Sequence, residues 1–160
     1  MAFFLPAALD SDNPKQQHSA PGGSATLVMV NPLRILVVED NPVNQKLLSL
    51  MLQPFGYTSV VAENGRIGYE RYLAGEFDLI LMDIQMPVMD GFEATAAIRA
   101  REDEAGGGHI PIIAVTAHVM PGYREQCLAR GMDNYIPKPF KMQELKEIIT
   151  NTLQQRNVAR

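Results

Sequence analysis

The chain has 160 residues, of which 46% are hydrophobic and 20% are charged, and its formal net charge is −4. This is enough material for one hydrophobic core and too little for a second, and the acidic balance argues against nucleic acid as the main partner because no basic stripe is available to meet phosphates. The single cysteine excludes an intrachain disulfide and fits a reducing compartment.

Residues 1–33 are rich in Pro, Gly, Ser, Asp and Asn and show no sustained periodicity. They predict a flexible linker or tail, followed by one folded domain over residues 34–154 and a short tail over residues 155–160. The first six residues are too short for a signal peptide and lack its basic flank, and no segment approaches the roughly 20 apolar residues of a spanning helix. We therefore expect no direct membrane contact.

The domain begins with a buried strand over residues 34–38, which ends in Glu39 and Asp40. A helix follows, because Asn41 is a good N-cap and Pro42 suits the first helical position. Apolar residues keep helical spacing as far as the stop at Pro54, namely Val43, Leu47, Leu50 and Met51. A second strand over residues 58–62 and a helix over residues 64–74 come next.

The most informative element is the apolar run over residues 79–82, which ends abruptly in Asp83. Four large apolar residues bounded by turn signals fit an interior strand of a parallel sheet. Because ligands of open α/β sheets bind at the carboxyl ends of such strands, Asp83 is a candidate for chemistry. A turn-rich stretch over residues 84–91 leads into a helix from Phe92 to about Glu102.

Two further strands complete the pattern, and each delivers a polar group at its end. Residues 112–115 end in Thr116, and residues 134–136 lead to Lys138. Between them, Pro121-Gly122 predicts a late or distorted helix, which ends near Gly131 as a C′ residue. The last helix carries one apolar side, formed by Phe140, Leu145, Ile148, Ile149 and Leu153. Strands that alternate with helices in this way predict a parallel α/β sheet with right-handed crossovers.

Four separated motifs, Val38 to Gln45, Met82 to Gly91, Thr116-Ala117 and Lys138-Pro139, follow one another in this order. With them the chain resembles, from about Arg34 to Leu153, the receiver (CheY-like) domain of two-component response regulators. The first two motifs look most like receivers of hybrid sensor histidine kinases. The resemblance implies a doubly wound, flavodoxin-like α/β fold with a five-stranded parallel sheet in the order 2-1-3-4-5 and helices on both faces. Ligands would then bind where strands 1 and 3 meet.

Glu39, Asp40 and Asp83 lie on those two strands, and three clustered carboxylates repel one another unless a cation or a proton intervenes. A hard cation that takes only oxygen ligands suits Mg²⁺ better than a softer metal. By the family's pattern, Asp40, Asp83 and the Gln85 backbone carbonyl are direct ligands, and Glu39 acts through water.

The resemblance also implies a function: Asp83 would accept a phosphoryl group from the phosphohistidine of a histidine kinase domain or a histidine phosphotransfer protein. The domain would thus catalyse its own phosphorylation and dephosphorylation, as a switch in a phosphorelay. Lys138 would neutralise phosphoryl charge, and Thr116 would hydrogen-bond the phosphoryl oxygens. Tyr135 occupies the family's aromatic switch position, while Gln85 and His118 occupy tuning positions. We expect a cytoplasmic location, as the cytosolic part of a membrane-anchored hybrid kinase or as a free-standing regulator.

Other readings stay open at this point. A haloacid dehalogenase-like phosphatase also uses a nucleophilic Asp and Mg²⁺, but it needs a second acid where this chain has Gln85. A phosphorylation-independent interaction module is a third class. Each residue also has a plain structural interpretation: Asp40 and Thr116 as helix caps, and Lys138 as a solvated loop charge.

Overall fold

Five parallel strands form one sheet in the order β2-β1-β3-β4-β5, which confirms the predicted topology. The computed structural model describes residues 31–158, so most of the predicted linker lies outside the described residues. The strands are β1 (Arg34–Val38), β2 (Thr58–Ala62), β3 (Leu79–Asp83), β4 (Ile112–Thr116) and β5 (Asn134–Pro137). The helices are α1 (Pro42–Leu52), the 3-10 turn η1 (Gln53–Phe55), α2 (Gly65–Ala74), α3 (Gly91–Glu104), α4 (Tyr123–Ala129) and α5 (Met142–Val158).

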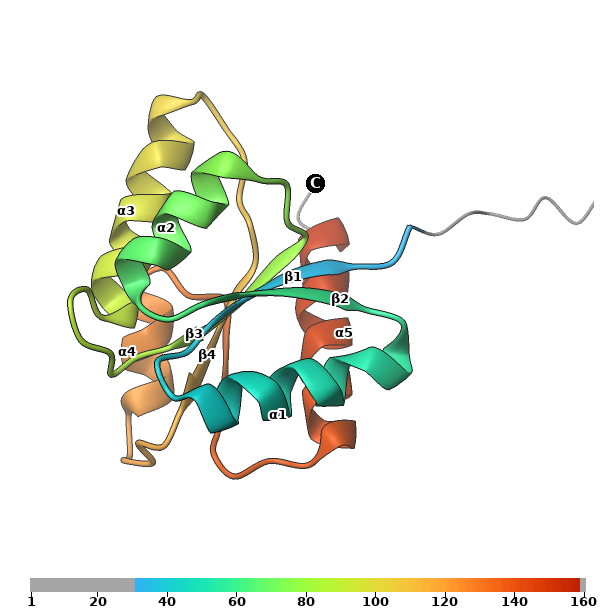
Figure 1. Ribbon diagram of the computed structural model, residues 1–160. Coiled ribbons are helices and arrows are strands. Elements are labelled where there is room, and N and C mark those ends of the chain that lie inside the picture. Colours follow the sequence, from blue (N-terminus) through green and yellow to red (C-terminus); the bar gives the residue numbers. More distant parts are fainter. Residues whose placement is uncertain (1–30, 159–160) are drawn as a thin grey trace, which may run out of the picture. The chain divides into compact units, whose positions relative to one another are not determined.

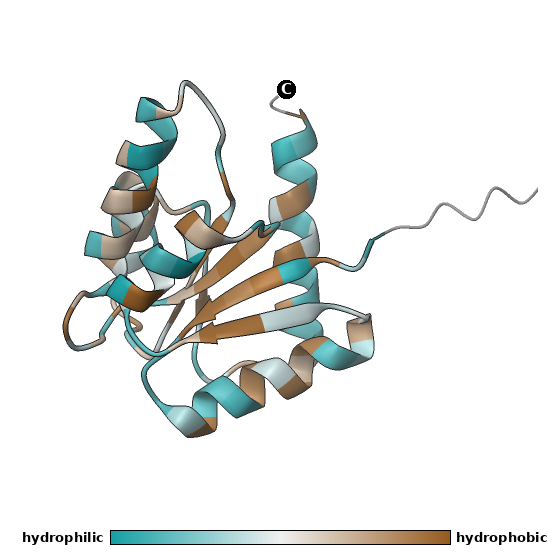
Figure 2. Ribbon diagram, turned by 45° about the horizontal axis from the view of Figure 1, so that its top comes forward, coloured by the Kyte–Doolittle hydropathy of each residue, from teal (hydrophilic) through white to brown (hydrophobic). Residues whose placement is uncertain are grey.

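The helices cover both faces of the sheet, with α1 and α5 on one face and α2, α3 and α4 on the other (Figure 1). Successive strand residues point to opposite faces. On β1, Ile35 and Val37 pack with α1 and α5, whereas Leu36 and Val38 pack toward α2, α3 and α4. Interior strands buried on both sides have to be apolar, and the interior strands β1 and β3 are accordingly brown along most of their length in Figure 2.

Helix α1 starts where the sequence predicts, but the residues it buries are mostly not the apolar residues from which it was predicted. The Asn41 side chain accepts hydrogen bonds from the backbone N–H groups of Val43 (2.9 Å) and Asn44 (3.3 Å). The helix ends at Leu52, and Pro54 lies in the 3-10 turn that follows. Of the four apolar residues used to predict this helix, only Met51 is buried, together with Leu48 and Leu52, while Val43, Leu47 and Leu50 are 74%, 54% and 49% exposed.

The boundaries of the later helices differ from the predicted ones by a few residues. Helix α3 is opened by a capping box between Asp90 and Glu93 and continues to Glu104. Helix α4 begins only at Tyr123, which confirms the late start predicted from Pro121-Gly122. Helix α5 extends to Val158, four residues past the predicted domain boundary. Between residues 31 and 158, no helix has the length and the apolar character needed to cross a membrane.

A partly buried ionic network holds the end of the sheet opposite Asp83. The Arg99 guanidinium on α3 donates to Glu102 at 2.7 Å, to Asp133 at 2.9 Å, and to the backbone carbonyls of Gly131 (2.9 Å) and Ile110 (3.0 Å). One side chain therefore joins α3, the segment before β4 and the segment before β5.

Candidate functional site

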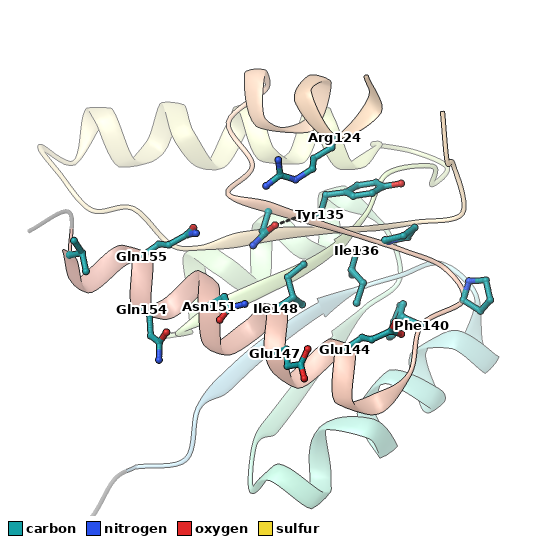
Figure 3. Close-up of a pocket in the computed structure, with 14 residues that line it drawn as sticks. Arg124, Tyr135, Ile136, Phe140, Glu144, Glu147, Ile148, Asn151, Gln154 and Gln155 are labelled. Atoms are coloured by element: carbon teal, nitrogen blue, oxygen red, sulfur yellow. Dashed lines mark hydrogen bonds between the residues drawn. The ribbon is translucent and has the colours of Figure 1, made fainter. Parts of the chain in front are cut away.

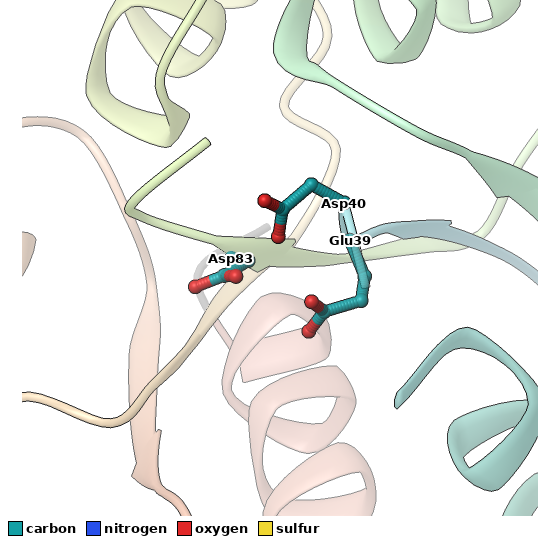
Figure 4. Close-up of side chains that lie close together, drawn as sticks. All are labelled: Glu39, Asp40 and Asp83. Atoms are coloured by element: carbon teal, nitrogen blue, oxygen red, sulfur yellow. The ribbon is translucent and has the colours of Figure 1, made fainter. Parts of the chain in front are cut away.

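Three carboxylates meet at the carboxyl ends of β1 and β3, which are neighbours in the sheet (Figure 4). Glu39 and Asp40 directly follow β1, and Asp83 is the last residue of β3. One carboxylate oxygen of each lies within 4.8 Å of the others. Glu39 and Asp83 are buried, at 1% and 8% exposure, whereas Asp40 faces solvent. The structure thus brings together the three acids predicted to form one site.

Glu39 is fixed by contacts that the sequence did not reveal. Its carboxylate accepts hydrogen bonds from the backbone N–H of Asn41 (3.1 Å) and from the Asn44 amide (3.4 Å). Its backbone N–H donates to the Ala62 carbonyl at 3.0 Å, and its carbonyl accepts from the Gln45 amide at 2.7 Å. The first turn of α1 therefore holds a buried acid in one position.

Lys138 reaches this cluster from the segment after β5. Its ammonium lies 2.6 Å from a Glu39 carboxylate oxygen and 3.7 Å from the nearer Asp83 oxygen. Its backbone N–H donates to the Thr116 carbonyl at 2.8 Å, which ties its position to the end of β4. In this structure Glu39, and not the predicted acceptor Asp83, is the closest partner of Lys138.

The surroundings of Asp83 disfavour its charged form. The pKa of Asp83 is raised from 3.8 to about 6, first by burial and then by the negative charges of Glu39 and Asp40. Lys138 and the hydrogen bond from the Ile84 backbone N–H, 2.7 Å long, lower the pKa and offset only part of the rise. The cluster therefore carries more negative charge than its protein neighbours neutralise.

The loop after Asp83 is held by two close backbone contacts that require glycine. A Cβ atom on Gly91 would lie 2.1 Å from the Asp83 carbonyl oxygen, and one on Gly65 would lie 2.4 Å from the Met89 carbonyl oxygen. The Gly91 N–H donates to the Ile84 carbonyl at 2.8 Å, and the Gly65 N–H donates to Met89 at 3.0 Å. We did not predict this positioning role, although a glycine at the first position of a helix hints at close backbone approach.

Thr116, His118 and Tyr135 form a connected group around the end of β4 and the neighbouring strand β5. Thr116 is buried, and its hydroxyl accepts a hydrogen bond from the His118 backbone N–H at 3.1 Å. The half-buried Tyr135 donates a hydrogen bond from its phenol hydroxyl to the His118 carbonyl at 2.7 Å. Tyr135 also lines a groove of about 880 Å³ between α4, β5 and α5 (Figure 3). Gln85 is exposed on the loop after Asp83.

The plain structural interpretations of the site residues are wrong. The side chain that caps α1 is Asn41 and not Asp40. Helix α4 begins seven residues after Thr116 with Gly122 at its N-cap, so Thr116 caps no helix. The Lys138 side chain is only 20% exposed and pairs with a buried acid, so it is not a solvated loop charge.

The donor set fits a hard divalent cation. The three clustered side chains offer carboxylate oxygens, and the predicted Gln85 ligand is also an oxygen, which suits Mg²⁺ and not a soft metal. The raised pKa of Asp83, caused first by burial and then by Glu39, indicates crowding that a bound cation would relieve.

Comparison with known proteins identifies the family. The sequence-family model of the response regulator receiver domain matches residues 35–150. Hybrid signal transduction histidine kinase I of Dictyostelium discoideum is 44% identical over 127 residues, which cover 76% of this chain and 7% of the relative. Sensor protein GacS of Pseudomonas syringae pv. syringae is 41% identical over 116 residues, or 72% of this chain and 13% of the relative. The chain thus matches only a small part of these longer relatives.

Solved structures of receiver domains have the same fold as this chain. The receiver domain of sensor histidine kinase PA1611 from Pseudomonas aeruginosa PAO1, which has a magnesium ion coordinated in its active site cleft, is 41% identical with a TM-score of 0.69. That match covers 77% of this chain and 98% of the other. A match in the Saccharomyces cerevisiae co-crystal structure of the phosphotransfer protein Ypd1 and the receiver domain of Ssk1 is 30% identical with a TM-score of 0.72, and covers 78% and 91%. The chain described here belongs to the response regulator receiver domain family and is a receiver domain of the two-component phosphorelay type.

Proposed function

We propose that Asp83 is the phosphoryl acceptor of this receiver domain and that the reaction depends on Mg²⁺. The observation that carries the proposal is the meeting of Glu39, Asp40 and Asp83 within 4.8 Å at the strand ends, beside the Lys138 ammonium. Of the three acids, Asp83 is the one at the end of the central strand β3. Its pKa, raised by burial to about 6, still leaves the nucleophilic carboxylate as the main form at neutral pH.

The proposed transfer is an in-line displacement. A carboxylate oxygen of Asp83 forms a bond to phosphorus, and the bond between phosphorus and the imidazole nitrogen of the donor breaks, so that imidazole leaves with the electron pair. Mg²⁺ held by Asp40, Asp83 and the Gln85 backbone carbonyl, with Glu39 acting through water, would neutralise charge on the phosphoryl oxygens. The Lys138 ammonium supplies a second positive charge after it moves from Glu39 toward the phosphoryl group. The Thr116 hydroxyl donates a hydrogen bond to a phosphoryl oxygen.

The surface beside the acids supports a protein as the phosphoryl donor. Helix α1 starts two residues after Asp40 and exposes Val43, Leu47 and Leu50. We infer that a histidine kinase domain or a histidine phosphotransfer protein docks there, and the Ypd1–Ssk1 complex supports this partner class. The small share of the relatives that this chain covers, 7% and 13%, supports a larger histidine kinase of which this domain is one part; a cytoplasmic location belongs to the same proposal.

The phosphatase alternative has less support. It needs a general acid two residues after the nucleophile, and the amide of Gln85 does not titrate in the range where it could serve as one.

Intact mass measurement tests the proposal. After incubation with a small phosphoryl donor and Mg²⁺, the wild-type chain should gain one phosphoryl group that is labile in base, and Asp83→Asn should gain none. Asp103→Asn is the matched control, because Asp103 is exposed on α3. Removal of Mg²⁺ should slow labelling strongly. Stoichiometric labelling of Asp83→Asn, or equal rates with and without the metal, would contradict the proposal.

A further inference from the structure

Asp40 is the exposed member of the acidic cluster, and the peptide groups on both sides of it are held by side chains. The Glu39 carbonyl, in the peptide before Asp40, accepts a hydrogen bond from the Gln45 side-chain amide at 2.7 Å. The Asn41 N–H, in the peptide after Asp40, donates to the Glu39 carboxylate at 3.1 Å. Because each peptide group is planar, these two hydrogen bonds set the direction in which the Asp40 side chain leaves the backbone, toward Asp83 (Figure 4).

Gln45 supplies a donor that the sheet does not supply at this point. The Glu39 N–H donates to the Ala62 carbonyl at 3.0 Å, which continues the pairing of β1 with β2 by one bond. In a parallel ladder, the carbonyl of the same residue would accept from the residue two positions further along the neighbouring strand, which here is Asn64. Strand β2 ends at Ala62, however, and Asn64 is the N-cap of α2. The Gln45 amide therefore takes the place of a strand N–H at the end of β1.

The same residue ties this corner of the chain to a packed helix. Gln45 lies in the first turn of α1, and its backbone N–H donates to the Asn41 carbonyl at 2.9 Å. Its backbone and its side chain thus bond to the chain on either side of Asp40. Because α1 is fixed to the sheet by the buried side chains of Leu48 and Leu52, the amide is presented from an element that packs in the core.

We propose that Gln45 is a positioning residue for Asp40 as a ligand of Mg²⁺. The inference rests on the proposed function, in which Asp40 and Asp83 hold the metal. With the peptide before Asp40 fixed, its carboxylate is held near Asp83 before a cation arrives, so that binding does not have to order the backbone. Without the Gln45 donor, the Glu39 carbonyl bonds to water and its peptide rotates more freely, so that Mg²⁺ binding has to order this peptide.

Mg²⁺ affinity of the full chain tests the proposal. Gln45→Met removes the donor and keeps the approximate length and the helix propensity of the side chain. Gln143→Met is the matched control, because Gln143 is exposed on α5 and its amide donates to Glu147 at 3.1 Å. The probe is Mg²⁺ alone, and the NMR shift of the Ile84 amide, which is bonded to the Asp83 carboxylate at 2.7 Å, reports binding.

We expect Gln45→Met to bind Mg²⁺ about threefold to tenfold more weakly than the wild type, which is the effect of about one hydrogen bond. Gln143→Met should bind with the wild-type affinity. Labelling of Gln45→Met by a small phosphoryl donor should need correspondingly more Mg²⁺ but should reach the wild-type rate at saturating Mg²⁺, because Asp83 and Lys138 keep their places. A general structural defect would lower that maximal rate as well, and such a result would contradict a positioning role.

Gln45→Glu is a second variant that keeps the length of the side chain and does not depend on the folding of the first. Its ionised carboxylate cannot donate to the Glu39 carbonyl, whereas its added negative charge would by itself favour a cation. We expect it to bind Mg²⁺ no more tightly than the wild type. Wild-type affinity in Gln45→Met, or tighter binding in Gln45→Glu, would overturn the inference alone. The absence of a Mg²⁺-dependent shift at Ile84 in the wild type would overturn the proposed function and the inference with it.

Discussion

Asp83→Asn should stabilise the metal-free domain at neutral pH, because the carboxylate of Asp83 is held where its charge is disfavoured. The pKa of Asp83 is raised by burial, and next by Glu39, from 3.8 to about 6. The folded state therefore binds this proton more tightly than the unfolded state does. The contribution of Asp83 to the free energy of unfolding is greatest below pH 3.8 and falls as the pH rises to about 6.

The gap between 3.8 and about 6 corresponds to about 3 kcal/mol at neutral pH. Solvent screening at the open side of the cluster reduces the effect, so we expect Asp83→Asn to raise the free energy of unfolding by about 1–3 kcal/mol. The Asn side chain can keep the hydrogen bond from the Ile84 N–H through its carbonyl oxygen. Lys138 keeps Glu39 as its partner at 2.6 Å.

Urea denaturation in the presence of a metal chelator measures the difference, at about pH 7 and again at about pH 4.5. The gain should shrink at the lower pH, where the wild-type carboxyl is protonated in the folded state. Addition of Mg²⁺ should stabilise the wild type more than Asp83→Asn, because the metal binds only the folded cluster. If the Asn variant is no more stable at neutral pH, or if the gain does not depend on pH, the charge argument is refuted.

Two further predictions concern residues that act on the fold. Gly91→Ala should lower the free energy of unfolding by about 1–3 kcal/mol, because the added Cβ would lie 2.1 Å from the Asp83 carbonyl oxygen. A urea midpoint of Gly91→Ala equal to that of the wild type would contradict this, because it would mean that the loop shifts to admit the Cβ atom without cost. Arg99→Ala should cost about 2–4 kcal/mol, because it leaves Glu102, which is 6% exposed, without its cation. Arg101→Ala, which breaks an exposed pair at 3.8 Å, should cost about 0–0.5 kcal/mol in the same assay, and equal costs for the two arginines would contradict the burial argument.

The alternation of strands and helices and the place of the acids could be predicted because both depend on short-range sequence patterns, whereas the strand order followed from the resemblance to receiver domains. Four of the five strands are marked by compact apolar runs. A polar residue that ends a parallel strand has to lie at the end of the sheet where the carboxyl ends of all the strands meet. That rule placed Asp83, Thr116 and Lys138 together at this end of the sheet. It did not give the partner of Lys138, because the distances to Glu39 and Asp83 depend on side-chain conformations across three strands.

Other features depend on tertiary packing and left little trace in the sequence. In α1, helical spacing was correct as a sign of a helix, but Val43, Leu47 and Leu50 turned out to be exposed. Apolar residues occur all round this helix, so periodicity alone could not choose the buried face. The packing of Tyr123, whose ring centroid lies 6.1 Å from that of Tyr135, was equally hidden, since Pro121-Gly122 predicts a late helix and does not say what the first side chain of that helix contacts.

The position of Lys138 links the stability of the site to its chemistry. Three carboxylates and one ammonium leave a formal charge of −2 when all are ionised, and the ammonium lies on Glu39, the most deeply buried acid. Asp40 and Asp83 are thereby left with little compensation, and burial together with Glu39 raises the pKa of Asp83. A better-neutralised Asp83 would stabilise the metal-free fold but would be a weaker nucleophile with less affinity for a cation. The charge imbalance that lowers stability is thus the same property that suits the cluster to bind Mg²⁺ and accept a phosphoryl group.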